Sequence, residues 1–237
     1  MAERVGTGVT GGGTTTSTTI ASSAKSTTSG NVLIAHAKWE NAGVAITGDS
    51  LSDTAGNTWV VLANVQNGGT SQPGTCLAYA KNIVGNASNV VTLTLSGSAD
   101  FRNIIVEEFS GLDLTSPEDG NEQTNSAASG TSHTTGDITT SGAGLVFIGV
   151  GIFAAISSVT GTPGNPDFTV GATAGESAVG YLISTSGQTV TPGLGNSTSA
   201  QWNAIAQAFK DAPAHIVTIG LGVTGQRPAA FSPGLAR

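Results

Sequence analysis

Glycine, threonine and serine together occupy 92 of the 237 positions, about 39% of the chain, and this bias limits the folds available to it. Charged residues make up only 10% of the chain, against about 25% in ordinary soluble domains. Exposed helix faces are normally built from Glu, Lys, Arg and Gln, whereas Thr, Val and Gly suit strands and turns. The composition therefore excludes a helical bundle and predicts an all-β fold, in one domain or one duplicated domain.

The charge balance limits the classes of partner. Fifteen acidic and eight basic residues give a net charge of −7, and the pI is near 4.7. Binding to a nucleic-acid backbone needs clustered Lys and Arg side chains, and the sequence contains no such cluster. We therefore expect no nucleic-acid partner.

Two further features bear on the compartment. Cys76 is the only cysteine, so no intrachain disulfide can form, and we expect a small buried hydrophobe at this position. The first thirty residues lack the basic start and apolar block of a signal peptide. The longest apolar run, 144–156, is shorter than the ~20 residues that span a bilayer. These features predict a protein made in a cytoplasm, without a membrane partner.

Strand-like runs bounded by Gly, Asn, Asp or Pro follow one another along the chain. Residues 1–19 include a Gly/Thr/Ser tract with little to bury, which predicts a flexible or extended lead-in. A polar loop is expected at 116–132. The predicted strands are 31–39, 59–65, 75–81, 90–95, 103–109, 144–154, 178–184 and 200–209.

An internal repeat organises these runs. The segment 29–36 is echoed by 141–148, and the run from Tyr79 to Phe109 is echoed by the run from Tyr181 to Phe209. Large aromatic residues are rare, so each half alone makes a poor core, and a single two-sheet antiparallel sandwich with strands from both halves is favoured. We expect a jelly-roll-like β-sandwich over 20–212, with pseudo-repeats at about 29–111 and 141–211, and an immunoglobulin-like sandwich as the alternative.

The C-terminal segment, 213–237, differs from both repeats. Four apolar residues alternate with Thr or Gly, and they predict one more strand, which continues into an extended arm containing Phe231. A strand outside the duplicated core needs a sheet edge, either in its own sandwich or in a neighbouring subunit. The subunit-contact hypothesis rests on Val217, Ile219, Leu221, Val223 and Phe231.

One segment suggests catalysis. Gly48-Asp49-Ser50-Leu51 resembles the first block of the GDSL family of esterases and lipases, which implies Ser50 as a nucleophile. A serine hydrolase also needs a base, and the family's late D-x-x-H block has no match, because Asp211 and His215 are spaced one residue too far apart. The adjoining segment 53–59 has the composition of a turn entering a strand, so local structure explains it without catalysis.

The remaining candidates are isolated polar or aromatic groups. The three histidines, His36, His133 and His215, are not at metal-ligand spacing. Glu107 and Glu108 are neighbours on a predicted strand and so point to opposite faces, which indicates a solvated face and a rim contact rather than a catalytic pair.

Two groups could bind ligands. The acidic residues Asp113, Glu118, Asp119 and Glu122 could hold Ca²⁺ through their carboxylate oxygens, although they lack the EF-hand spacing. The aromatic residues Trp39, Trp59, Trp202 and Tyr79 could form a sugar-stacking platform, but a chain poor in aromatics needs them in its core. We therefore predict no catalytic, cofactor or metal residues.

Several segments together resemble a known module. The segments D-T-A-G-N-T-W (53–59), Y-A-K-N-I (79–83), N-V-V-T-L-T-L (89–95) and V-E-E-F-S-G-L-D (106–113) resemble a β-sandwich module of virion structural proteins in tailed bacteriophages and of some bacterial surface proteins. The resemblance spans about 20–210. It implies a non-enzymatic virion protein, such as a capsid decoration (cement) protein, that binds the major capsid or other virion proteins and copies of itself, possibly as a trimer. A tail-fibre or carbohydrate-binding surface module and a GDSL-type esterase are the alternatives.

Overall fold

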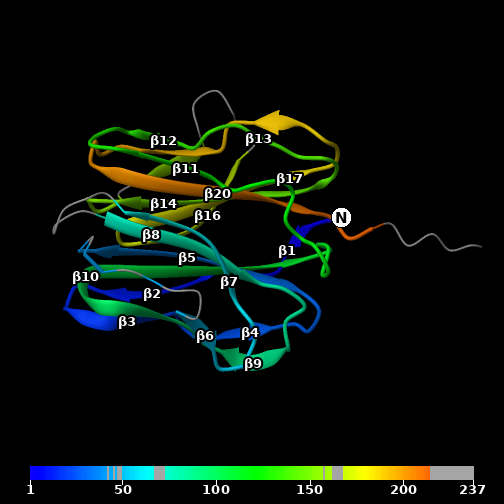
Figure 1. The fold of residues 1–237 in the computed structure, drawn as a ribbon, viewed down its shortest axis with the longest axis horizontal. Coiled ribbons are helices and arrows are strands. Elements are labelled where there is room, and N and C mark those ends of the chain that lie inside the picture. Colours follow the sequence, from blue (N-terminus) through cyan, green and yellow to red (C-terminus); the bar gives the residue numbers. More distant parts are fainter. Residues whose placement is uncertain are drawn as a thin grey trace, which may run out of the picture.

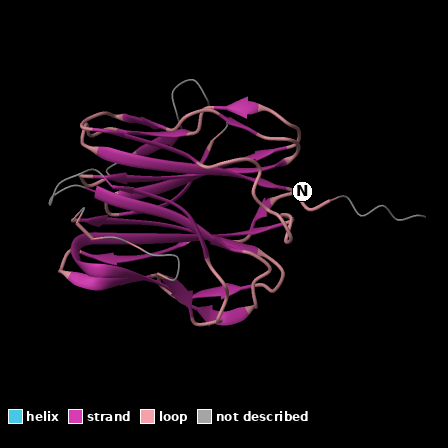
Figure 2. Cartoon of the chain, viewed as in Figure 1, coloured by secondary structure: helices cyan, strands magenta, loops and turns pink. Residues whose placement is uncertain are grey.

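The computed structural model describes residues 1–41, 43, 44, 46, 50–66, 73–156, 158–161 and 168–213. These residues form strands, turns and loops without a helix, as Figure 2 shows, so the predicted all-β class is confirmed. In the same residues no helix has the length and apolar character needed to cross a lipid bilayer.

The first half of the molecule contains the strands up to Ser110. They are β1 (Glu3–Arg4), β2 (Val9–Gly13), β3 (Ser17–Ala21), β4 (Lys25–Thr27), β5 (Val32–Glu40), β6 (Leu51–Asp53), β7 (Val60–Gln66), β8 (Pro73–Ala80), β9 (Asn86–Asn89) and β10 (Val91–Ser110).

The second half contains the strands from Gln123 onward. They are β11 (Gln123–Ala127), β12 (Ser132–Thr134), β13 (Ile138–Thr139), β14 (Gly144–Ile152), β15 (Val159–Gly161), β16 (Thr169–Ala174), β17 (Ser177–Ser184), β18 (Thr189–Val190), β19 (Gly193–Asn196) and β20 (Trp202–Lys210).

The two halves have the same strand plan. Each has an inner sheet, ordered β2-β10-β5-β8-β7 in the first half and β11-β20-β14-β17-β16 in the second. Each also has outer strands, β3-β10-β6 with β4-β9 in the first half and β12-β19-β15 with β13-β18 in the second. The single long strand β10 therefore corresponds to β19 and β20 together. The shared plan identifies the molecule as a duplication.

The sheets stack in layers, which Figure 1 shows edge-on. The two inner sheets face each other across a central core, which contains Ile34 and Phe109 from the first half and Phe147 and Phe209 from the second. Each inner sheet packs its other face against its own outer strands, around Trp39 in the first half and Trp202 in the second. Because the inner strands are buried on both faces, β5, β8, β14 and β20 have long runs of buried residues instead of a polar alternation.

The central core is symmetric. Tyr79 pairs with Ile34 on β5, and Tyr181 pairs with Phe147 on β14, so the two tyrosines hold equivalent positions, as do Phe109 and Phe209. The Tyr79 ring meets Phe209 edge-on with centroids 5.6 Å apart, and Phe109 meets Tyr181 in the same way at 5.5 Å. Reciprocal contacts of this kind are the signature of a two-fold interface, here between halves of one chain.

The structure corrects the register of the first repeat segment. The sequence alignment places Val32 with Gly144, but Val32 pairs with Phe109 and Leu145 pairs with the equivalent Phe209. Val32 therefore corresponds to Leu145. A shift of one residue moves every side chain of a strand to the opposite face, so only the pairing could settle the register.

Of the two alternatives predicted for residues 1–19, a flexible lead-in is wrong and an extended one is confirmed, because β1, β2 and β3 all pair with β10. The glycines are the physical reason. A Cβ on Gly11 would lie 1.8 Å from the Ala21 carbonyl oxygen, and one on Gly12 would lie 2.1 Å from that of Arg102. The tract thus packs backbone against backbone, which an argument from apolar side chains misses. Likewise, β11 lies within the segment 116–132 that was expected to be a loop.

The predicted sandwich is confirmed, and the molecule also has an outer layer of strands on each side that was not predicted. Each half contributes one sheet to the central sandwich, and each half also closes an outer layer around a core of its own. The argument that a half is too poor in aromatics for a core is wrong, because Ala, Val, Ile and Leu fill most of both outer cores. The jelly-roll connection pattern stays a prediction.

Candidate functional site

The five predicted subunit-contact residues, Val217 to Phe231, lie outside the described residues, but the base from which their segment leaves is described. After β20, the Asp211 amide donates to the Ala143 carbonyl at 3.1 Å, and the Ala212 amide donates to the Gly111 carbonyl at 2.8 Å. The chain up to Pro213 is therefore tied to the sandwich, and the C-terminal segment leaves from a fixed point.

The N-terminus lies at the same point, beside the last described part of the chain (Figure 1). The Ala2 amide donates to Asp211 Oδ1 at 2.6 Å, and the Met1 amine lies 3.5 Å from Asp211 Oδ2. Gly111 sits against them with a φ of +74°, and a Cβ there would lie 2.0 Å from the Met1 carbonyl oxygen. A side chain at Gly111 would break this junction.

The linker between the halves runs along the end of β20. The Asp113 amide donates to the Lys210 carbonyl at 2.9 Å, the Lys210 amide to the Pro117 carbonyl at 2.7 Å, and the Asp119 amide to the Ala208 carbonyl at 2.9 Å. Both termini of the body and the linker thus converge on one end of the inner sheets. We take this junction as the candidate functional site.

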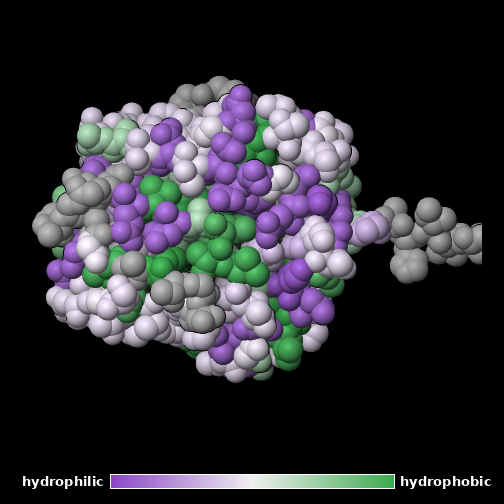
Figure 3. Space-filling model, viewed as in Figure 1, coloured by the Kyte–Doolittle hydropathy of each residue, from purple (hydrophilic) through white to green (hydrophobic). Residues whose placement is uncertain are grey.

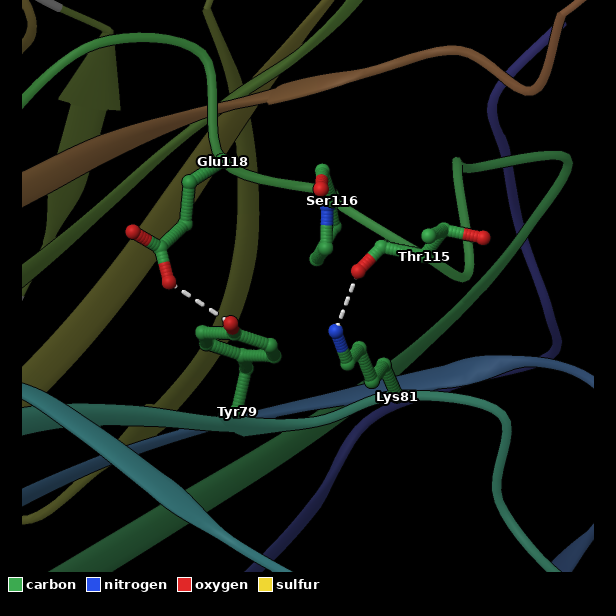
Figure 4. A pocket seen from close by; sticks show the side chains of 6 residues that line it. Tyr79, Lys81, Thr115, Ser116 and Glu118 are labelled. Atoms are coloured by element: carbon green, nitrogen blue, oxygen red, sulfur yellow. Dashed lines mark hydrogen bonds between the residues drawn. The ribbon is translucent and has the colours of Figure 1, made fainter.

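A polar cavity of about 330 Å³ opens at the junction, lined by Tyr79, Lys81 and residues 115–118. Figure 4 shows its two side-chain contacts: the Tyr79 hydroxyl donates to Glu118 Oε1 at 2.6 Å, and the Lys81 ammonium donates to the Thr115 carbonyl. Burial, and then the bond to Glu118, raise the pKa of Tyr79. These two contacts tie the linker residues Glu118 and Thr115 to Tyr79 and Lys81. The side chains that line the cavity therefore hold the linker in place.

Two acidic residues of the linker accept hydrogen bonds from nearby backbone amides. Asp113 Oδ1 caps the amides of Thr115 and Ser116, which lowers the pKa of Asp113, and Asp119 Oδ2 accepts from the Ser141 amide. Across the described ranges, no group of three or more His, Cys, Asp or Glu side chains is placed to hold a metal ion. The carboxylates serve as turn and strand caps.

Ser50 is not hydrogen-bonded to either of the two histidines that the structure describes. Ser50 is buried, and its carbonyl accepts from the Thr94 amide, while Gly48 and Asp49 of the GDSL-like block lie outside the described residues. Neither ring nitrogen of His36 or of His133 has a hydrogen-bond partner, so neither histidine is bonded to Ser50. His215 is not among the described residues.

The aromatic residues considered for sugar stacking are all in the interior. Trp39, Trp59, Trp202 and Tyr79 are at most 8% exposed, so they offer no platform for a sugar ring and serve as core residues. Cys76 is also buried, which raises its pKa to about 12 and confirms it as a small core residue.

Glu107 and Glu108 point to opposite faces of β10 as expected, but the prediction of a solvated face is wrong, because both are fully buried. Glu107 accepts two bonds from the Arg4 guanidinium, at 2.7 and 2.8 Å, and one from the Ala172 amide. Glu108 accepts from the Asn31 side chain at 2.7 Å and from the Thr28 amide at 2.9 Å. The inner sheet is covered on both faces, so neither carboxylate reaches solvent.

Sequence reasoning missed that two polar residues of β5 are buried between the two halves. Lys38 is fully buried, and its ammonium donates to Glu40 at 2.9 Å and to Glu176 of the other half. Burial, the largest influence, raises the pKa of Glu40. His36 packs against Gly149, where a Cβ would lie 2.2 Å from the ring, and burial lowers its pKa to about 3. The signal was present: a lysine and a histidine within the apolar run V-L-I-A-H-A-K-W.

Comparison with known proteins finds no protein-family model, no curated protein and no solved structure that matches the chain.

Proposed function

We propose that the chain is a non-enzymatic structural protein of a phage particle, of the capsid decoration or cement kind. The sandwich would bind the particle surface, and the C-terminal segment would reach neighbouring subunits or the major capsid protein. The sequence segments that resemble virion β-sandwich modules support this proposal, as do the bonds from Ala172 to Glu107 and from Lys38 to Glu176, which join the two halves.

The observation that carries the proposal is the fixed base of the C-terminal segment. Pro213 follows residues that are hydrogen-bonded to Ala143 and Gly111, and the N-terminus is tied to Asp211. A segment that starts from a rigid base loses less conformational freedom when it docks than one that leaves a mobile tail. The alternation of Val217, Ile219, Leu221 and Val223 suits addition to a sheet edge, with backbone bonds for affinity and apolar pockets for specificity.

The test is a particle-binding experiment. A chain truncated after Pro213 is compared with the full chain for co-sedimentation with purified particles that lack the protein. We expect the truncated chain to keep the thermal unfolding midpoint of the body and to lose most of its binding. Normal binding by the truncated chain would contradict the proposal. Imaging of the decorated particle then separates a capsid position from a tail-fibre position.

A further inference from the structure

The outer edges of the two inner sheets differ. Strands β7 and β16 are equivalent, since Val60 pairs with Tyr79 and Thr169 pairs with the equivalent Tyr181. Both strands carry a register shift at the same point, between Val61 and Ala63 in β7 and between Val170 and Thr173 in β16. Among the described strands each pairs on one side, with β8 or β17. A strand edge without a partner is a site where another strand can add.

The edge of β16 is covered by the first half. Glu107 Oε1 accepts from the Ala172 amide at 3.1 Å, and the Arg4 guanidinium holds the Glu107 carboxylate in place. A Cβ on Gly171 would lie 3.0 Å from the same Glu107 oxygen. The buried ion pair of Arg4 and Glu107 therefore already bonds one amide of β16.

The edge of β7 has no ion pair of this kind among the described residues; the second half contacts it through Asn203, whose Nδ2 donates to the Val65 carbonyl at 3.3 Å. Gln207 holds the position of Glu107 in the second half, because Gln207 pairs with Phe147 and Glu107 pairs with Ile34. Its Nε2 donates to the carbonyls of Gly120 and Ala208, and its Oε1 accepts from no group in the described part of the chain. The two equivalent edges are therefore contacted by different groups: a buried ion pair at β16 and the neutral Asn203 amide at β7.

The edge of β7 is apolar. β7 reads V-V-L-A-N-V-Q, without charge or proline, and Val60 is 37% exposed while Val61, Leu62, Ala63 and Val65 are partly exposed. Figure 3 shows hydrophobic side chains gathered at the centre of one face, in the region of β7 and β8. Natural sheet edges are usually guarded by charges or proline, so an apolar edge of seven residues indicates a partner strand.

We propose that β7 accepts the apolar segment 217–223 from a second copy of this chain. The segment has seven residues, like β7, and its apolar residues alternate at strand spacing. Neither β7 nor the segment 217–223 contains a charged residue. No charged group therefore has to lose its hydration when the two come together. This inference rests on the proposed function, for which it names the acceptor edge.

The geometry favours a second copy over the same chain. Phe209, near the end of β20, packs on Tyr79, the partner of Val60, whereas Asn203, near its start, donates to the Val65 carbonyl at 3.3 Å. The segment therefore leaves beside the Val60 end of its own β7, with three residues between Pro213 and Val217. Folding back from there would place it parallel to β7, whereas every described strand pair is antiparallel. A neighbouring copy can supply the antiparallel orientation.

Disulfide trapping between two full-length chains tests the proposal. One chain carries Val60→Cys, and the other carries a single cysteine at 217, 219, 221 or 223, so that any engineered bridge joins two molecules. Native Cys76 is buried and contributes little background. Because a disulfide needs Cβ atoms about 3.5–4.5 Å apart, we expect at least one of the four positions to give a cross-linked pair after mild oxidation.

The duplication supplies the matched control. Thr169→Cys places a cysteine at the equivalent point on the covered edge of β16, and it should cross-link at least tenfold less than Val60→Cys. Absence of a bridge from Val60→Cys to all four positions, or equal trapping at both edges, would overturn the proposal.

The molar mass in solution gives a second test. The full chain should self-associate, and the chain truncated after Pro213 should be a monomer at the same concentration. A monomeric full chain would overturn the proposal. Both tests use isolated protein, so they are independent of particle binding: trapping without particle binding would refute the proposed function alone, and particle binding without trapping would refute this inference alone.

Discussion

The two halves of the molecule share one strand plan but bring different side chains to the interface between them. The first half presents His36, Lys38 and Glu107, and the second half presents Gly149, Gly151 and Gln207 at the equivalent positions. Large groups of one half thus lie against the glycines of the other, since a Cβ on Gly151 would lie 2.8 Å from the Lys38 side chain. An interface between identical halves cannot combine large and small residues in this way, because both copies would change together.

The comparison also shows one position with a charged residue in the first half, Glu107, and a neutral residue in the second half, Gln207. Glu107 needs Arg4 because a buried carboxylate without a partner is costly, whereas the neutral Gln207 needs no cation. Glu107 bonds an amide of the β16 edge, whereas Gln207 bonds only the carbonyls of Gly120 and Ala208. The two halves therefore differ in the side chains that contact the sheet edges.

The largest expected effect tests the charged position. Arg4→Met leaves Glu107 buried and unpaired, and we expect it to lower the free energy of unfolding by about 3–5 kcal/mol. Adding Glu107→Gln makes the first half resemble the second and should recover most of the loss. Chemical denaturation of the two variants measures both values, and a double variant no more stable than Arg4→Met would contradict the pairing.

The next prediction concerns His36, whose equivalent is a glycine. Its pKa in the folded protein is lowered to about 3 from the usual 6.5, because burial disfavours the charged ring. As the pH falls below 6.5, the unfolded chain binds a proton there that the folded chain does not. This proton should lower the free energy of unfolding with a slope that approaches about 1.4 kcal/mol per pH unit below pH 6, or by about 2 kcal/mol in total between pH 6.5 and 4.5.

The control for this titration is His36→Leu, measured by denaturation at several pH values between 6.5 and 4.5. The difference in slope between the two proteins should correspond to one proton. Parallel pH profiles would show that His36 is not the group responsible.

A smaller effect tests the fit between large and small residues. Gly149→Ala places a methyl group into the His36 ring, and we expect a loss of about 1–3 kcal/mol from overpacking. Gly142→Ala is the matched control, because a Cβ there would meet no atom within 4 Å. His36→Ala should partly relieve the Gly149→Ala variant. Thermal unfolding of the four variants gives the comparison, and additive losses would argue against direct contact.

The smallest expected effect lies at the junction. Tyr79→Phe removes the hydroxyl that donates to Glu118 but keeps the ring packed on Phe209, so we expect a loss of about 1 kcal/mol. Glu118→Gln keeps an acceptor oxygen and should lose less. Both can be read from denaturation midpoints, and a larger loss for Glu118→Gln would mean that the charge of Glu118, and not the hydrogen bond, matters.

Many of the strands could be predicted from the sequence, and physical reasons explain which were predicted and which were missed. The predicted strands near 31–39, 75–81, 144–154 and 200–209 are confirmed within two residues at each end. The strands predicted at 90–95 and 103–109 are one strand, β10: the turn-forming residues Gly97 and Asp100 at their join shift the register but do not reverse the chain. The glycine-rich strand β2 was missed, because its stabilisation comes from close backbone approach and not from apolar side chains.

The candidate sites were less accessible. The residue types near Ser50 and in the acidic linker suggested chemistry, yet Ser50 is buried and the Asp113, Glu118 and Asp119 carboxylates accept bonds from neighbouring residues. Conversely, Arg4 and Glu107 are 103 positions apart in the chain, so nothing in the local pattern connects them. Contacts between distant residues depend on how sheets stack, and the period of a single strand does not encode that.

The sequence by itself determined the all-β class, the duplication and the positions of most strands, because composition, two-residue periodicity and turn residues act over short distances. Only the tertiary structure decided the register of the repeats, the pairing of the two inner sheets and the difference between their edges. These depend on which side chains meet across an interface, and a shift of one residue or an exchange of Glu for Gln changes them without altering the local pattern.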